Sequence, residues 1–128
     1  SVNIAAERVV TPGTQSILSF SGVPGSIVRF LSYAFYATAS GLSQIVPTVN
    51  GIRVFPYHGD PIDNYAINVS SGPDLSNASM ISCLLDLQPT DKLEWTYFNT
   101  TGGNVNVGVR MVGYVDQSTI RKIGRFGG

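Results

Sequence analysis

Apolar and polar residues alternate with a period of two along most of the chain, and glycine and proline interrupt the alternation at short intervals. The runs between these breaks are rich in Val, Ile, Phe, Tyr and Thr, which suit a pleated, half-buried strand. The only helical feature we expect is a turn at 74–78. The expected strands are 4–10, 16–20, 26–38, 43–49, 52–56, 65–69, 79–87, 92–99 and 104–116. Eight or nine strands at this spacing predict an all-β fold, an antiparallel β-sandwich with jelly-roll or Greek-key topology.

The last two expected strands show the alternation most clearly, in the stretch DKLEWTYFNTTGGNVNVGVRMVGYV at 91–115. Leu93, Trp95 and Tyr97 share one face of the first strand. In the second strand, every other residue from 105 to 115 is Val, Met or Gly. We expect a hairpin whose apolar faces meet in the sandwich core. Its glycine-bearing connection at 100–104 tolerates the backbone of a tight turn.

The stretch IVRFLSYAFYATA at 27–39 is apolar on both faces of its expected strand. One face is expected to carry Val28, Phe30, Ala34 and Tyr36, and the other Ile27, Leu31, Tyr33 and Phe35. Only one side of each sheet in a sandwich is core. A loop, an arm or another subunit must therefore cover the second side. We predict that Tyr33 and Phe35, together with Val112 and Tyr114 of the last strand, form a subunit interface.

The composition strengthens this prediction of contact with other protein. Charged residues make up 12% of the 128 residues, against roughly 25% in an ordinary soluble domain, while 43% are hydrophobic. The formal net charge is zero, so no global field attracts nucleic acid or an anionic membrane. The length predicts a single sandwich domain at 1–116, with a candidate N-terminal arm at 1–14, and a short tail at 117–128.

Targeting and redox features are few. The first fourteen residues have no basic region followed by an apolar run, so no signal peptide is expected. The longest apolar stretch is too short to span a bilayer. One cysteine, Cys83, excludes an internal disulfide and fits a reducing compartment.

The tail at 117–128 is basic. Arg121, Lys122 and Arg125 lie there, whereas all acidic residues of the chain precede it. Two interpretations stay open: a solvated terminus, or a tether that docks on an acidic partner surface with apolar anchors beside the charges.

No set of residues predicts catalysis, a cofactor or a metal site. The only histidine, His58, lies in PYHGDPID with Asp60 and Asp63, a composition typical of a turn. Neither a nucleophile motif nor the spacing of a calcium loop accompanies it. Cys83 lies in MISCLLDL, where it is expected to be a small core residue. We therefore expect a protein that is not an enzyme.

The segment LLDLQPTDKLEWTYFN, followed by a glycine turn and a valine-alternating strand, resembles the closing half of small viral jelly rolls. It is similar, more loosely, to the trimeric C1q and tumour-necrosis-factor-like sandwiches. The matching positions are 84–87, Asp91, 93–97 and 105–114, with Thr90 where a glycine is usual. The resemblance implies a capsid decoration (cement) or other minor capsid protein of a virus or bacteriophage.

The same resemblance implies a homo-oligomer, with a trimer as the expected form, seated on the major capsid protein lattice. The place would be the exterior of a virion made in the host cytoplasm, with neither nucleic acid nor membrane as a partner. Shell contact is expected from Val2, Ile4 and Arg8 of the candidate arm and from the basic tail residues. The alternative is a carbohydrate- or receptor-binding module, such as a fibre tip, with its site at Tyr57, His58 and Asp60 and in the loop at 99–104.

Overall fold

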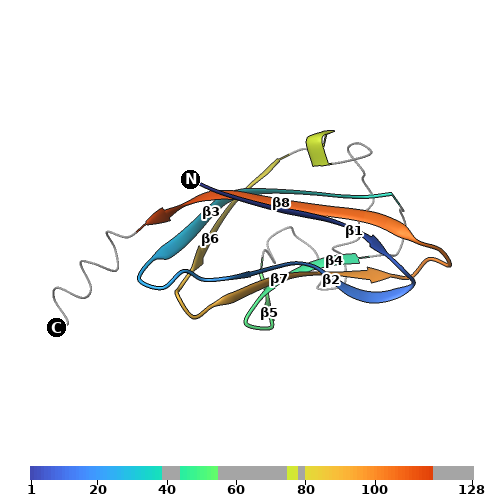
Figure 1. Cartoon of the computed structure of the whole chain (residues 1–128), viewed down its shortest axis with the longest axis horizontal. Coiled ribbons are helices and arrows are strands. Elements are labelled where there is room, and N and C mark those ends of the chain that lie inside the picture. The colour runs from blue at the N-terminus through green and yellow to red at the C-terminus, as the bar shows by residue number, and fades with distance from the viewer. Residues whose placement is uncertain (39–43, 55–74, 78–79, 117–128) are drawn as a thin grey trace.

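The computed structural model describes residues 1–38, 44–54, 75–77 and 80–116, and its strands form two sheets (Figure 1). The elements are β1 (Val2–Val10), β2 (Gly13–Ser21), β3 (Ile27–Ala37), β4 (Gln44–Val49), β5 (Ile52–Arg53), the 3-10 helix η1 (Leu75–Asn77), β6 (Ile81–Leu87), β7 (Lys92–Asn99) and β8 (Val105–Asp116). Eight of the expected strands are therefore present, with ends shifted by up to three residues. The helical turn expected at 74–78 is η1, and the strand expected at 65–69 lies outside the described residues.

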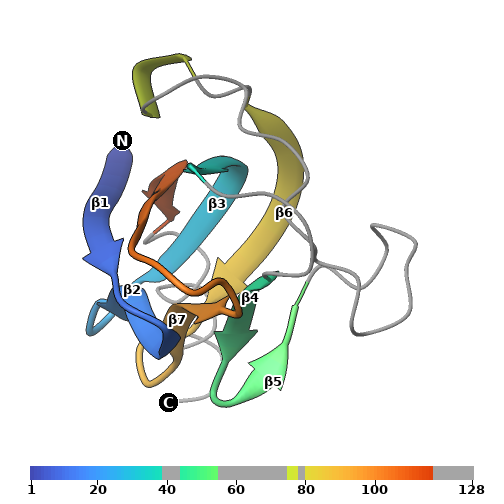
Figure 2. The same ribbon diagram turned by 90° about the vertical axis from the view of Figure 1, so that its right-hand side faces the viewer.

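One sheet has the order β1-β8-β3-β6 and the other the order β2-β7-β4-β5, and all strand pairs are antiparallel. Consecutive strands alternate between the two sheets, except β4 and β5, which are neighbours. The sheets lie face to face as two layers (Figure 2). Eight strands in this order make a jelly roll, so the predicted fold class is confirmed.

The predicted hairpin at 91–115 is wrong in its pairing. β7 pairs with β2 and β4, whereas β8 pairs with β1 and β3, so the connection at 100–104 crosses from one sheet to the other. Asn99 holds this crossing, because its Nδ2 donates to the carbonyl oxygens of Val10 (3.0 Å) and Gly103 (2.9 Å). The two inner faces do meet in the core as expected: Trp95 Nε1 donates to Met111 Sδ at 3.2 Å.

Large side chains from both sheets fill the core. The largest that are fully buried are Trp95, Tyr33, Tyr97, Phe30, Ile17, Ile45, Leu87, Leu93, Met111, Val10 and Val28. Each large apolar side chain stabilises the fold by about 1.5–3 kcal/mol when it leaves water. The inner faces of both sheets are thereby occupied by the core, and only their outer faces can contact another molecule.

A bulge in β3 decides which of its side chains reach the core. The register shifts between Phe30 and Ser32 against both neighbouring strands. Leu31 is an extra residue against β8, so the alternation changes phase there. Phe30 faces the core before the bulge, and Tyr33 faces the core after it.

The expectation that Tyr33 and Phe35 face away from the core is therefore wrong. Tyr33 is only 2% exposed, and its ring centroid lies 5.4 Å from that of Trp95. Phe35 stacks on Tyr33 at 6.2 Å between centroids. An alternation counted without the bulge assigns both residues to the opposite face.

Candidate interaction surface

The outer face of the β1-β8-β3-β6 sheet has two halves, and the chain covers one of them itself. Helix η1 stands over this half (Figure 1), and its Leu75 is buried. A Cβ at Gly108 would collide with the Tyr36 ring and lie 2.9 Å from Leu75 Cγ. The absence of a side chain at Gly108 thus lets Tyr36 and Leu75 pack over β8. Part of the second apolar side of β3 is buried by the protein's own η1 segment.

The other half of this face carries exposed apolar side chains. Leu84 is 67% exposed, Leu31 46% and Tyr114 37%, and Val112 is partly exposed. Leu31 lies at the β3 bulge, Val112 pairs with Ser32, and Tyr114 pairs with Arg29, so these positions are adjacent in the sheet. We call Leu31, Leu84, Val112 and Tyr114 the open half-face. Apolar side chains gathered on one surface mark an interaction site more often than single exposed ones do.

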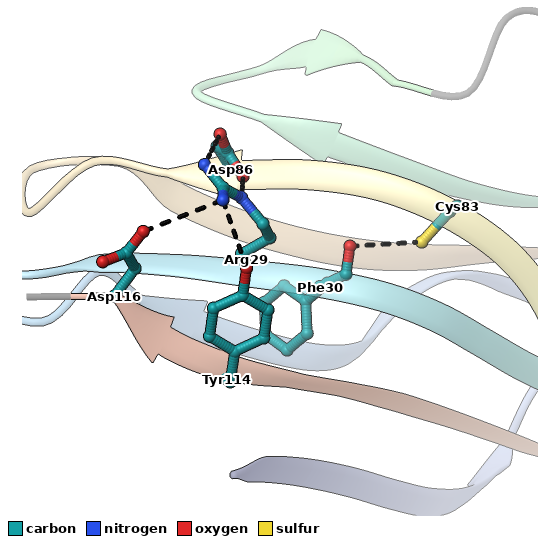
Figure 3. Close-up of polar contacts among 6 residues, drawn as sticks. All are labelled: Arg29, Phe30, Cys83, Asp86, Tyr114 and Asp116. Atoms are coloured by element: carbon teal, nitrogen blue, oxygen red, sulfur yellow. Dashed lines mark hydrogen bonds and ion pairs between the residues drawn. The ribbon is translucent and has the colours of Figure 1, made fainter. Parts of the chain in front are cut away.

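Arg29 forms a polar group at the edge of the open half-face (Figure 3). Its Nε donates to Asp86 Oδ1 at 2.7 Å and its Nη2 to Asp86 Oδ2 at 3.0 Å. Its Nη1 donates to Tyr114 Oη at 3.1 Å and lies 3.7 Å from Asp116 Oδ2. Strand β6 supplies Asp86 and strand β8 supplies Tyr114 and Asp116, on the two sides of β3, so the sheet register itself holds the guanidinium in place.

These contacts fix the charge state of Arg29. The hydrogen bond to Asp86, followed by that to Tyr114, raises the pKa of Arg29 above its already high ordinary value. The guanidinium therefore stays protonated at any physiological pH and does not transfer protons. What the group offers is a rigid pattern of donors and acceptors beside an apolar surface.

Sequence reasoning did not identify Arg29, Asp86 or Leu84 as functional. A signal was present, because Arg29 and Asp86 are single charges inside otherwise apolar strands. Charges at such positions must face outward or find a partner. The pairing of β3 with β6, which places Arg29 opposite Asp86, could not be inferred from local pattern.

The predicted interface residues of the last strand do face outward. Tyr114 is exposed and Val112 is partly exposed, in contrast to the inward-facing Tyr33 and Phe35. Their contact with another subunit stays a prediction.

The candidate arm is a strand of the sandwich. β1 pairs with β8 over all nine of its residues. Val2 and Ile4 pack against the core, and Arg8 Nε donates to the Ile17 carbonyl oxygen at 3.1 Å. The other predicted contact residues lie outside the described part of the chain: Tyr57, His58, Asp60, Arg121, Lys122 and Arg125.

The remaining chemistry of the described residues is limited. They contain no group of three or more His, Cys, Asp or Glu side chains that could hold a metal ion. A shallow pocket of about 200 Å³ lies between Glu7, Arg8, Val9, Tyr36 and Asn106. Burial raises the pKa of Cys83 to about 11. Across the same residues, no helix is long and apolar enough to cross a membrane.

Comparison of the chain with protein-family models, with curated proteins and with solved structures gave no match.

Proposed function

We propose that the protein is a non-enzymatic structural component of a virus particle. It would be a capsid decoration (cement) or minor capsid protein that assembles with copies of itself on a capsid lattice. The observation that carries the proposal is the open half-face on a jelly roll whose chain is poor in charge. Jelly rolls include viral capsid domains as well as lectins and cupins, so the surface, more than the fold, supports this choice.

The open half-face supports self-association on energetic grounds. Leu84, Leu31 and Tyr114 still expose much of their surface to water, and covering it is favourable by about 25 cal/mol for each Å² of apolar area. The Arg29–Asp86 pair is already ordered by its own sheet, so these two side chains would lose little further entropy when a partner docks against them. An apolar centre beside a fixed polar group is the usual arrangement of a specific interface.

Attachment to a lattice would then work by multivalency. Several copies joined through the open half-face would each make a weak contact with the shell, and the joined contacts would hold far more tightly than one. The basic residues Arg121, Lys122 and Arg125 are the proposed contacts to an acidic shell surface.

Native mass spectrometry and sedimentation velocity of Leu84→Asp test this proposal. Leu84 is 67% exposed, so the change leaves the core intact while placing a charge in the open half-face. We expect oligomers for the wild type and monomers for the variant. The matched control is Ile52→Asp, because Ile52 is 73% exposed on β5 of the other sheet. This control should remain oligomeric.

Three outcomes would count against the proposal. A wild-type protein that is monomeric at all concentrations would remove self-association, and dissociation by Ile52→Asp alone would move the interface to the other sheet. A monomer that binds glycans, with binding lost in Tyr57→Ala, would favour the carbohydrate-binding alternative.

A further inference from the structure

Three loops meet at one end of the sandwich and are tied together by Asp91. Asp91 Oδ2 accepts from the Gln88 backbone N–H at 2.8 Å, and the Asp91 carbonyl oxygen accepts from the Gly22 N–H at 2.8 Å. Asp91 Oδ1 accepts from Asn50 Nδ2 at 2.8 Å. The turn before β7, the end of β2 and the β4–β5 turn thus share one carboxylate-bearing residue.

Asn50 is held at both atoms of its side-chain amide. Besides the bond from Nδ2 to Asp91, its Oδ1 accepts from the Lys92 backbone N–H at 2.9 Å. We call these two bonds the Asn50 clasp. Asn50 and Gly51 form the two-residue turn between β4 and β5, with positive φ angles of 52° and 81°. This is the backbone that an Asn-Gly pair adopts most readily in a tight hairpin.

The same dipeptide is chemically labile. Asn50-Gly51 is the only Asn-Gly pair in the chain, and a following glycine offers no side chain to hinder attack on the amide. The Gly51 backbone nitrogen can bond to Asn50 Cγ, and the Cγ–Nδ2 bond then breaks and releases ammonia. Water opens the resulting cyclic imide, leaving aspartate or isoaspartate at position 50.

We propose that Asn50 is a deamidation site that the Asn50 clasp keeps closed in the folded protein. The clasp ties the amide nitrogen to Asp91 and the amide oxygen to the Lys92 backbone at the start of β7. Attack by Gly51 requires the side chain to rotate, and this rotation breaks both bonds. The rate of modification therefore follows the small fraction of molecules in which this corner is open.

Deamidation would permanently remove the hydrogen bond between position 50 and Asp91. A carboxylate at position 50 has no N–H to donate to Asp91, and it would face a like charge across the former hydrogen bond. The β4–β5 turn would then lose its tie to the turn at 88–91. Asp91, which the sequence pattern marks in the turn before β7, thus receives a protective role.

The first test follows deamidation of the full chain by peptide mapping with isoaspartate detection, at neutral pH and elevated temperature. Folded wild type should modify Asn50 at least about tenfold more slowly than the same chain unfolded in urea. Asp91→Ala should increase the rate of Asn50 deamidation in the folded protein several-fold. Glu7→Ala removes a carboxylate from β1, in the other sheet from β4, β5 and β7, and should leave the rate unchanged. Equal rates for folded and unfolded wild type would overturn the proposal, whether or not Asp91→Ala folds.

The second test exchanges the two side chains. Asn50→Asp mimics the product and should lower the melting temperature. Adding Asp91→Asn gives position 91 an N–H that can donate to the new carboxylate, so the double variant should recover most of the loss. Such recovery is the signature of direct coupling between the two positions. Additive losses in the double variant would contradict the clasp.

Discussion

At Gly113 the backbone of β8 lies so close to that of β3 that a side chain has no room. Gly113 pairs with Phe30, immediately before the β3 bulge. A Cβ at position 113 would collide with the Arg29 carbonyl oxygen and lie 2.7 Å from Phe30 Cα. Because both obstacles are backbone atoms, no side-chain rotation can relieve the collision.

We therefore expect Gly113→Ala to lower the free energy of unfolding by about 1–3 kcal/mol or more. Urea denaturation followed by tryptophan fluorescence measures the change. Gly102→Ala is the matched control, since a Cβ there meets nothing within 4 Å. A Gly113→Ala variant as stable as this control would contradict the close approach at the bulge.

Cys83 gives a second residue-scale prediction, through its pKa. Desolvation raises this pKa from 9.0 to about 11, and its Sγ lies 3.8 Å from the Phe30 carbonyl oxygen. The thiolate is the reactive form. Between pH 7 and 9 the folded thiol should be alkylated about a hundredfold more slowly than in the unfolded chain. Iodoacetamide labelling with and without urea measures the ratio.

The raised pKa of Cys83 also determines how the stability of the fold changes with pH. Because the folded state holds the proton more tightly, the contribution of Cys83 to stability is fully present below pH 9. It is lost as pH rises toward 11. Cys83→Ala should lose less stability than the wild type between pH 9 and 11. A variant whose stability depends on pH as that of the wild type does would contradict the raised pKa.

At the scale of elements, the position of each strand in its sheet predicts how firmly it is held. β3 and β8 are the two central strands of their sheet, whereas β5 has only two residues and lies at an edge. Opening an edge strand breaks one ladder and exposes little core, so it costs less free energy.

Hydrogen exchange should therefore be slowest for the amides of β3 and β8 and fastest for those of β5. Mass spectrometry or NMR measures these rates directly. β4 serves as an internal reference, because it is central in the same sheet as β5. Protection of β5 equal to that of β8 would mean that another contact covers this edge.

At the scale of the whole molecule, the salt dependence of assembly separates the two proposed contact surfaces. Association through the apolar open half-face should change little between low and high salt. Contact through Arg121, Lys122 and Arg125 should weaken strongly, because exposed charges are screened over about 10 Å at 0.1 M salt. Sedimentation of the purified protein at low and at high salt measures the self-association through the open half-face. Dissociation at high salt would indicate that charged residues join the copies.

Local pattern predicted most of the fold and part of the surface. Alternation around Trp95 and Val107 correctly identified inward positions in β7 and β8, because the period of a strand is a local property. The outward positions of Val112 and Tyr114 followed from the same count. Tyr33 and Phe35 were assigned to the wrong face, because an extra residue in a strand changes the phase and leaves no mark in composition.

The sequence by itself determined that this chain forms an antiparallel sandwich of short strands, because alternation and turn residues act over a few neighbouring positions. Only the tertiary structure decided which strands pair, that β7 and β8 belong to different sheets, and that Arg29 meets Asp86 and Tyr114. These contacts join residues more than fifty positions apart. Such partners are chosen by sheet register and core packing across the whole domain, which no short window of sequence contains.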